Sequence, residues 1–230
     1  NDTAALLVHY ILDAYKNNGT MPTNGFTAAT VVTTDLIADI SSAHGVPCYR
    51  CLTGFKWIAD IINHKPQEQF LVGGEESYGY LIGDAVRDKD AVASAAMIAE
   101  MAAHAKAQGR TVLQQLETIH REFGQYQERL ISITKKGRSG AQEIADMMTA
   151  LRNDPPKTLA GSPVVIAIDH SSSTQTDLRT GTTTNTELPA SNVLQFITEA
   201  GDKVSARPSG TEPKIKFYFS VRATTGDSHA

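Results

Sequence analysis

Strand-like and helix-like segments alternate along the first half of the chain. Between Asp2 and Lys16 apolar residues recur at the spacing of a helical face, and Gly19 shortly after them is a typical helix stop. Further along, β-branched or apolar runs each lead into another stretch with helical spacing. We expect strands at 28–33, 48–52 and 70–73 and helices at 2–16, 35–43, 55–63 and about 89–108. Strands that alternate with helices predict an α/β domain with a mostly parallel mixed sheet.

The pattern changes after Gly124, which follows a helical stretch at 111–123. We place a domain boundary near residue 125, so that residues 1–125 form the α/β domain. Residues 126–230 are then predicted to form a smaller α+β domain with an antiparallel sheet. Its expected elements are strands at 126–134 and 164–169, a helix at 139–152, a turn or mobile hairpin at 171–186, and a half-buried strand with Ile215, Phe217, Phe219 and Val221 on one face.

Composition narrows the class of protein. The chain has 230 residues and a formal charge of -4, which gives no electrostatic reason to expect a nucleic-acid partner. No apolar run approaches the roughly 20 residues that span a bilayer, and no basic segment followed by an apolar one opens the chain. We therefore expect a cytoplasmic protein with neither a nucleic-acid nor a membrane partner.

The two cysteines, Cys48 and Cys51, have the C-x-x-C spacing of redox and metal sites. They lie in a predicted strand, where an offset of three sends their side chains to opposite faces. A redox pair lies instead at a helix N-terminus, and zinc needs two more ligands nearby. We expect structural cysteines and no metal site.

The segment from Arg207 to Lys214, Arg-Pro-Ser-Gly-Thr-Glu-Pro-Lys, concentrates groups that bind anions. A guanidinium can grip a phosphate with two hydrogen bonds, and Ser209 and Thr211 add hydroxyl donors. Gly210 has no side chain, so backbone N–H groups there can close on an oxyanion. The alternative is a rigid polar turn in which Arg207 pairs with a glutamate, Glu212.

Two further turns follow predicted strands, where open α/β sheets place their ligand loops. In Gly73–Gly79 the carboxylate of Glu75 and the hydroxyl of Ser77 suit a polyol, although an acidic turn that caps the next helix explains the same residues. In the other turn Lys56 can reach a phosphate near a helix N-terminus, or it is a solvated lysine of an amphipathic helix.

Together these motifs resemble the α-D-phosphohexomutase family, which includes phosphoglucomutases and phosphomannomutases. The matching segments are Thr53-Gly-Phe-Lys56, Gly74-Glu-Glu-Ser-Tyr-Gly79 with the Gly83–Ala91 segment behind it, and Arg207–Tyr218. The resemblance runs from about Asn1 to Arg222 and implies the third and fourth of the family's four domains. The phosphoserine loop and the D-x-D-x-D-R magnesium loop of the first two domains do not occur in this sequence. We therefore expect a fragment, truncated also at its C-terminus, where relatives continue with a further helix.

The resemblance also implies residue roles. Glu75 and Ser77 would read two hydroxyls of a hexose, while Arg207, Ser209, Gly210 and Thr211 would hold the phosphate that is not being transferred. Lys56 would lie near the reacting end as a catalytic candidate. The intact parent would use Mg²⁺ and glucose 1,6-bisphosphate as activator, whereas this fragment would hold no cofactor.

Three alternatives remain open from the sequence. As an isolated fragment the chain would be a non-catalytic sugar-phosphate-binding module that lacks the N-terminal domains of its parent. The parent would act on glucose phosphates, because the sugar-loop motif and the segment behind it look closer to those of bacterial α-phosphoglucomutases, or else on mannose or pentose phosphates. A weaker alternative is a thiol oxidoreductase that uses the two cysteines. Some relatives carry a histidine where this chain has Gly79, so the residue that moves the proton is not identified.

Overall fold

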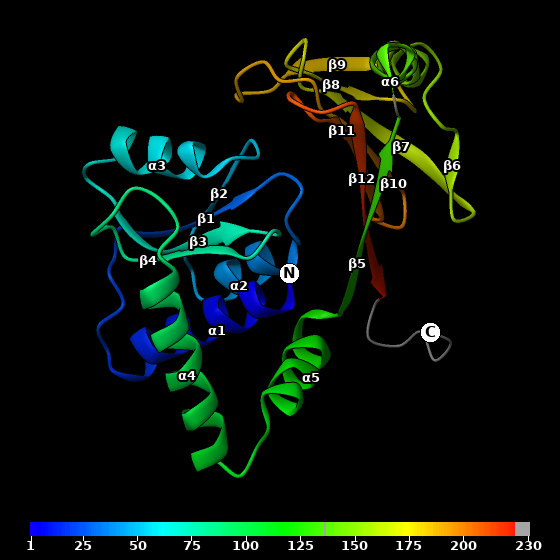
Figure 1. Cartoon of the computed structure of the whole chain (residues 1–230). Helices are drawn as coiled ribbons and strands as arrows, with labels where there is room; N and C mark the ends of the chain where they lie inside the picture. The colour runs from blue at the N-terminus through cyan, green and yellow to red at the C-terminus, as the bar shows by residue number, and fades with distance from the viewer. Residues whose placement is uncertain (136, 224–230) are drawn as a thin grey trace. The chain divides into compact units, whose positions relative to one another are not determined.

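A computed structural model describes residues 1–135 and 137–223. The chain divides into two compact units, whose described residues are Asn1–Gln125 and Tyr126–Ala223, and each unit has its own sheet (Figure 1). Residues 224–230, which the sequence analysis assigned to the second domain, lie outside the described residues.

The sheet of the first unit has the strand order β2-β1-β3-β4. The first three strands run parallel and β4 is antiparallel to β3, so the predicted α/β domain with a mostly parallel mixed sheet is confirmed. In Figure 1, α3 lies on one face of this sheet and α1 and α2 lie on the other. The strands are β1 (Gly25–Thr30), β2 (Cys48–Cys51), β3 (Gln69–Glu75) and β4 (Gly79–Ile82), and the helices are α1 (Asp2–Asn17), α2 (Leu36–Ala43), α3 (Phe55–His64), α4 (Ala91–Ala107) and α5 (Val112–Phe123).

Apolar burial on both faces holds this sheet in place. Every residue of β1 is buried, because the strand lies between two parallel neighbours and under helices on both sides. On one face Phe55, Ile58 and Ile62 of α3 pack in one cluster with Phe26 and Phe70 of the strands beneath. Such a helix needs apolar residues every three to four positions, which is the spacing in the sequence.

The glycine-rich loop predicted after residue 73 is instead the tip of a β-hairpin. β3 continues to Glu75, and β4 begins at Gly79 and pairs back along it. A Cβ atom at Gly74 would lie 2.5 Å from the carbonyl oxygen of Gly79, so the two strands approach each other there more closely than a side chain allows. These glycines therefore permit strand pairing rather than mark a loop.

The second unit contains an antiparallel sheet with the order β5-β12-β11-β10-β7-β8-β9, and β6 pairs with β7. This confirms the predicted α+β fold with an antiparallel sheet. The Ser- and Thr-rich segment at 171–186 forms the hairpin β8–β9, which pairs with β7 through β8. The elements are β5 (Gln125–Thr134), α6 (Arg138–Asn153), β6 (Thr158–Leu159), β7 (Ser162–Asp169), β8 (Thr174–Asp177), β9 (Thr182–Asn185), β10 (Leu194–Thr198), β11 (Lys203–Pro208) and β12 (Lys214–Ala223).

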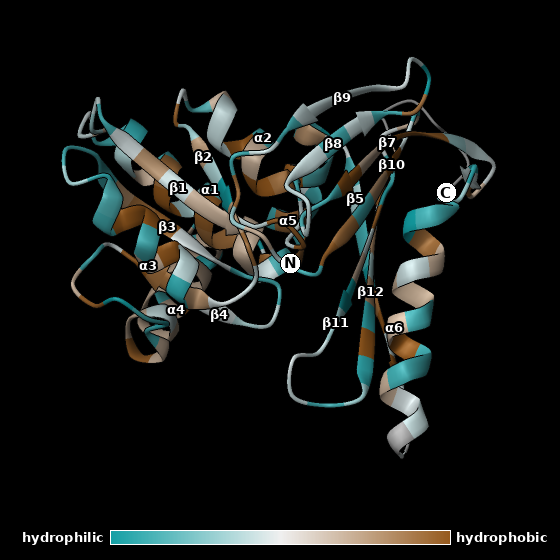
Figure 2. Ribbon diagram, turned by 90° about the horizontal axis from the view of Figure 1, so that it is seen from above, coloured by the Kyte–Doolittle hydropathy of each residue, from teal (hydrophilic) through white to brown (hydrophobic). Residues whose placement is uncertain are grey.

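The core of the second unit lies between α6 and one face of the sheet. Figure 2 shows that α6 carries both hydrophobic and hydrophilic residues, and Ile144 and Met148 pack against strand residues that include Ile215. The predicted alternation along β12 holds only at its start. Tyr218 on the other face is also buried, and Val221 is 46% exposed because it lies outside the cluster that α6 covers.

Met148 offers a test of this core. It is 1% exposed, so Met148→Ala removes buried apolar atoms and leaves a cavity, and we expect a loss of about 2–5 kcal/mol in the free energy of unfolding. Leu178→Ala in the same unit is the control, because Leu178 is 40% exposed and should cost less than about 1 kcal/mol. Denaturant unfolding of both variants measures the difference, and equal losses would contradict the assigned core.

Candidate functional site

Three parallel strands of the first unit end at one edge of the sheet. β1 ends at Thr30, β2 at Cys51 and β3 at Glu75, and the strand-to-helix turn that holds Lys56 follows β2. This carboxyl edge is where open α/β sheets bind ligands. The structure therefore brings the predicted sugar loop and the lysine turn together.

A direct hydrogen bond joins these two segments. Glu75 is 9% exposed, and its Oε1 accepts the backbone N–H of Gly54 at 2.7 Å. Gly54 has φ 116°, a conformation that favours glycine, and it caps the N-terminus of α3. A backbone donor at a helix start stabilises a nearby carboxylate, so the position of Glu75 is fixed relative to the turn.

The adjacent carboxylate is bound to the end of another strand. Oε2 of Glu76 accepts hydrogen bonds from the hydroxyls of Thr30 at 3.3 Å and Thr33 at 3.4 Å. These two threonines also share a hydrogen bond of 2.8 Å. Glu75 is therefore held at the start of α3 and Glu76 at the end of β1. Neither glutamate caps the next helix along the chain, α4, whose N-cap is Asp90.

Ser77 and Tyr78 form the exposed tip of the hairpin. Tyr78 is 83% exposed and has φ 64°, which is unusual for a bulky residue. Ser77 is exposed, whereas Glu75, two residues earlier in the hairpin, is buried. A fixed carboxylate and an accessible hydroxyl on one hairpin can recognise neighbouring hydroxyl groups of a polyol.

Two lysines lie at this edge, and the sequence analysis named only one. Lys56, exposed on the first turn of α3, holds its ammonium 5.0 Å from the centre of the Trp57 ring. Lys89 was missed. A Cβ atom at Gly79 would lie 2.8 Å from Cδ of Lys89, whose ammonium lies 5.6 Å from the centre of the Phe55 ring. Lys89 thus fills the space beside the loop that a side chain at position 79 would take.

Electrostatics favours the charged form of Lys89. A hydrogen bond to Asp88 and, to a smaller extent, the charge of Glu75 raise its pKa above the ordinary value. The only sequence signal for this residue was its place within the Gly83–Ala91 segment of the resemblance, which assigned it no role.

The predicted phosphate loop lies in the second unit as the turn between β11 and β12. The Ser209 N–H donates to the Lys214 carbonyl at 2.7 Å, which closes the turn. Ser209 Oγ accepts from the N–H groups of Thr211 and Glu212 at 3.4 and 3.3 Å. Gly210 and Thr211 are exposed at the tip, and a Cβ atom at Gly210 would meet no atom within 4 Å.

Arg207 is half-buried at the end of β11 and pairs in register with Lys216 on β12. Within the described residues its side chain makes no hydrogen bond or ion pair, and Glu212 pairs with Lys214 instead, at 3.0 Å. The alternative in which Arg207 pairs with Glu212 is therefore wrong. Directly opposed side chains on antiparallel strands lie on the same face, so the structure adds a second cation, Lys216, beside Arg207.

A cavity of about 510 Å³ lies between α6 and this turn. Its apolar wall includes Ile144 and Met148 of α6, and its polar wall is the segment from Pro208 to Pro213. Ser209, Gly210 and Thr211 line the cavity, whereas Arg207 does not. Arg207 and Lys216 are therefore neighbours of the turn in sequence and register but not part of the cavity lining.

Both cysteines are free thiols in the structure. Neither forms a disulfide, and burial raises the pKa of the Cys51 thiol to about 12. Such a thiol is a poor nucleophile at neutral pH, which argues against a redox pair. Among the described residues no group of three or more His, Cys, Asp or Glu side chains could hold a metal ion, and no helix could cross a bilayer.

Comparison with known proteins identifies the family. Residues 1–122 match the family model described as phosphoglucomutase/phosphomannomutase, alpha/beta/alpha domain III. The chain is 36% identical over 222 residues to a phosphoglucomutase of Staphylococcus epidermidis, which covers 96% of this chain and 40% of that protein. A phosphoglucomutase of Staphylococcus aureus is 35% identical over 201 residues, or 87% of this chain and 36% of that protein.

Solved structures share the fold. The open form of parafusin, a Paramecium phosphoglucomutase, has a TM-score of 0.67 and 17% identity over 100% of this chain and 38% of that chain. A putative phosphomannomutase of Thermus thermophilus has a TM-score of 0.59 and 15% identity over 95% of this chain and 37% of that chain. The chain belongs to the phosphoglucomutase/phosphomannomutase family, as its motifs predicted. It spans about two fifths of the length of the relatives it matches.

Thiol titration tests the assignment of the cysteines. Cys51 is 3% exposed while Cys48 is half-exposed. We expect one thiol to react with Ellman's reagent in the folded chain and the second only after denaturation, because burial disfavours the thiolate. Cys48→Ser should abolish the reaction of the folded chain. Rapid modification of both thiols in the folded state would contradict the assignment.

Proposed function

We propose that this chain is the sugar- and phosphate-binding part of an enzyme that interconverts hexose 1-phosphate and hexose 6-phosphate, with glucose favoured. The reaction would pass through a hexose bisphosphate and an enzyme phosphoserine, and this makes the parent an isomerase that works by intramolecular phosphoryl transfer. The phosphoserine and the ligands of the Mg²⁺ ion would belong to the parent's other domains. The parent would be cytoplasmic, with glucose 1,6-bisphosphate as its activator.

The observation that carries this proposal is the pairing of Arg207 with Lys216 beside the Ser209–Thr211 turn. Like charges directly opposite each other destabilise a sheet. A phosphate between the two side chains replaces that repulsion with two attractive interactions, and the guanidinium can grip it with two parallel hydrogen bonds. An anion site is therefore a better explanation of this pair than a structural turn.

The carboxyl edge of the first unit would bind the sugar. Glu75 is buried and anchored on Gly54, so its carboxylate is oriented before a ligand arrives, and Ser77 is exposed at the tip of the same hairpin. Remote contacts of this kind hold the sugar and its distal phosphate, and they position the reacting hydroxyl without covalent help from this part of the enzyme. Lys56 and Lys89 are the two side chains here that could move a proton or balance charge.

A second function applies to the chain on its own, which we propose is a non-catalytic module that binds sugar phosphates weakly. Neither the phosphoserine loop nor the D-x-D-x-D-R pattern occurs in its sequence. Binding and turnover are therefore separable in experiment.

An activity assay separates the two statements. The full-length protein, supplied with Mg²⁺ and glucose 1,6-bisphosphate, should convert glucose 1-phosphate to glucose 6-phosphate, and the 230-residue chain should not, because it lacks the phosphate donor. Mannose 1-phosphate and ribose 1-phosphate are the comparison substrates. Turnover by the purified chain above background, or an inactive full-length protein, would contradict the proposal.

The phosphate site is tested by calorimetric titration of variants with glucose 6-phosphate. Arg207→Ala should weaken binding more than Thr211→Ala, since a charged bidentate contact contributes roughly 1.5–3 kcal/mol against about 1 for a neutral hydroxyl. Arg207→Lys should restore only part of the affinity, because lysine lacks the planar fork. Lys216→Ala should give an intermediate loss, and Arg179→Ala, at an exposed site on the same unit, is the control.

A purely structural role for the turn predicts the opposite pattern. Arg207→Ala would then lower the melting temperature and leave the affinity for glucose 6-phosphate unchanged. The titrations are best made in the full-length protein, where both ends of the ligand are held, and the melting temperatures in the same samples.

A further inference from the structure

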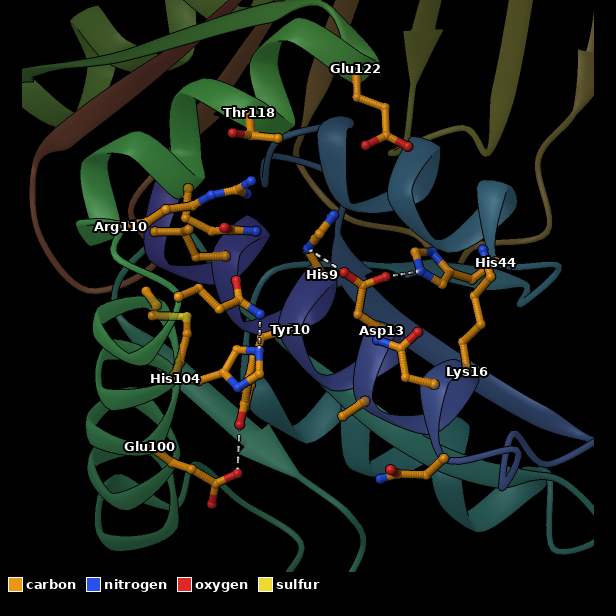
Figure 3. A pocket seen from close by; sticks show the side chains of 18 of the residues that line it. His9, Tyr10, Asp13, Lys16, His44, Glu100, His104, Arg110, Thr118 and Glu122 are labelled. Atoms are coloured by element: carbon orange, nitrogen blue, oxygen red, sulfur yellow. Dashed lines mark hydrogen bonds and ion pairs between the residues drawn. The ribbon is translucent and has the colours of Figure 1, made fainter.

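A polar cavity of about 550 Å³ lies within the first unit, between α1, α4 and α5. One wall includes His44, just after the end of α2 and shortly before the start of β2. The cavity therefore opens near the amino ends of the parallel strands, at the end of the sheet opposite the sugar loop. Figure 3 shows that side chains from these helices surround it.

Two of the acidic side chains that line the cavity are already bound within the unit. Asp13 contacts two imidazoles, with Oδ1 3.0 Å from His44 Nε2 and Oδ2 3.3 Å from His9 Nδ1. Glu100 accepts a hydrogen bond of 2.7 Å from the Tyr10 hydroxyl, and burial together with this bond raises the pKa of Tyr10 to about 12. Among the lining carboxylates only Glu122 makes no hydrogen bond or ion pair with the described residues.

The groups that remain are mostly donors. His9 is 7% exposed, its Nδ1 faces Asp13, and its Nε2 has no partner within the described part of the chain. Arg110 and Lys16 likewise make no ion pair or side-chain hydrogen bond there. In Figure 3, Arg110, Thr118 and Glu122 line one side and His9 lies across from them. Nε2 of His9 is therefore available to a group bound in the cavity.

We propose that this cavity binds a small anion with phosphate or carboxylate groups, and that its donors are Arg110 and, when the His9 ring is protonated, Nε2 of His9. Two cations that are unpaired within the described residues, Arg110 and Lys16, against the one unpaired carboxylate of Glu122 favour an anion over a cation, and a protonated His9 adds a further donor. The volume is within the usual range for small-molecule sites, roughly 300–1,000 Å³. The site lies wholly in the first unit and is independent of the function proposed above.

The proposal has a thermodynamic signature in His9 itself. Burial lowers the pKa of His9, opposed by Asp13 and, more weakly, by Glu122, while His44 lowers it further; the ring of Phe123 packs edge-on 6.3 Å away. An anion beside Nε2 stabilises the charged imidazolium, so binding must raise this pKa. By reciprocity, the anion binds more tightly as the pH falls through the titration of His9.

The experiment is an NMR titration of the full chain with histidine side chains labelled with ¹³C, in an Arg207→Ala background that removes the other proposed anion site. Inorganic phosphate and citrate are the probes, and chloride at equal ionic strength is the reference. We expect saturable shifts of the His9 ring signals in the millimolar range and a higher His9 pKa in the presence of the anion that binds. Comparison of the titrations with phosphate and with citrate shows whether the site prefers a phosphorylated or a carboxylated ligand.

Charge-changing variants identify the class of ligand. Arg110→Ala should weaken binding about five- to tenfold. This is less than the loss expected for a buried charged hydrogen bond, because Arg110 is exposed and solvent screens its charge. Glu122→Gln should tighten it about two- to threefold, since it removes a repulsive charge. Lys106→Ala, on the exposed side of α4 and outside the cavity lining, should leave the affinity unchanged.

Three outcomes would overturn the proposal: no saturable shift of His9 with either probe, an unchanged His9 pKa in their presence, or weaker binding in Glu122→Gln. The last result would indicate a cationic ligand. Thermal melting of each variant identifies any that fail to fold, and His9→Gln supplies a second test, because it should weaken binding and remove its pH dependence.

Discussion

The hydrogen bond from the Gly54 N–H to Oε1 of Glu75 organises the candidate sugar site. A carboxylate that is 9% exposed needs partners, because burial without hydrogen bonds costs several kcal/mol. The donor here is the residue just before α3, whose N-terminus carries partial positive charge. One contact therefore satisfies a buried acid, caps a helix and fixes the distance between two loops. Because Gly54 has φ 116°, a residue with a side chain at this place would be strained.

The sequence predicted the alternation of strands and helices in the first unit, because the side-chain spacing of a strand and that of a helix both appear within a short stretch of sequence. Strand β4 was missed because its pairing depends on close approach between Gly74 and Gly79, and glycine in a sequence looks the same in a loop and in a tight strand pair. The same limit concealed Lys89. Lys89 lies beside Gly79 because the chain folds back after β4. The spacing of residues in the sequence does not predict such a contact.

In the second unit the sequence indicated which residues could grip a phosphate but not how they are arranged. Arg207 and Lys216 are nine positions apart, and only the register of β11 with β12 makes them neighbours. Register is set by the turn and by the apolar face that meets α6, so it follows from packing. The alternative that paired Arg207 with Glu212 was wrong for a similar reason. Closure of the turn brings Lys214 to Glu212 instead.

The first unit separates two kinds of polar chemistry at the two ends of one sheet. At the carboxyl edge, the contacts of Glu75 and Glu76 with Gly54, Thr30 and Thr33 fix two carboxylates in a preorganised arrangement that suits hydroxyl groups. At the opposite end, Asp13 contacts two imidazoles, Glu100 accepts a hydrogen bond from a phenol, and Arg110 and Lys16, which are unpaired among the described residues, line the cavity. His9 and His44 are far apart in sequence, and the packing of α1 against α2 brings their rings to 6.1 Å between centroids. The length of the strands keeps the two kinds of chemistry apart, since one lies at their carboxyl ends and the other near their amino ends.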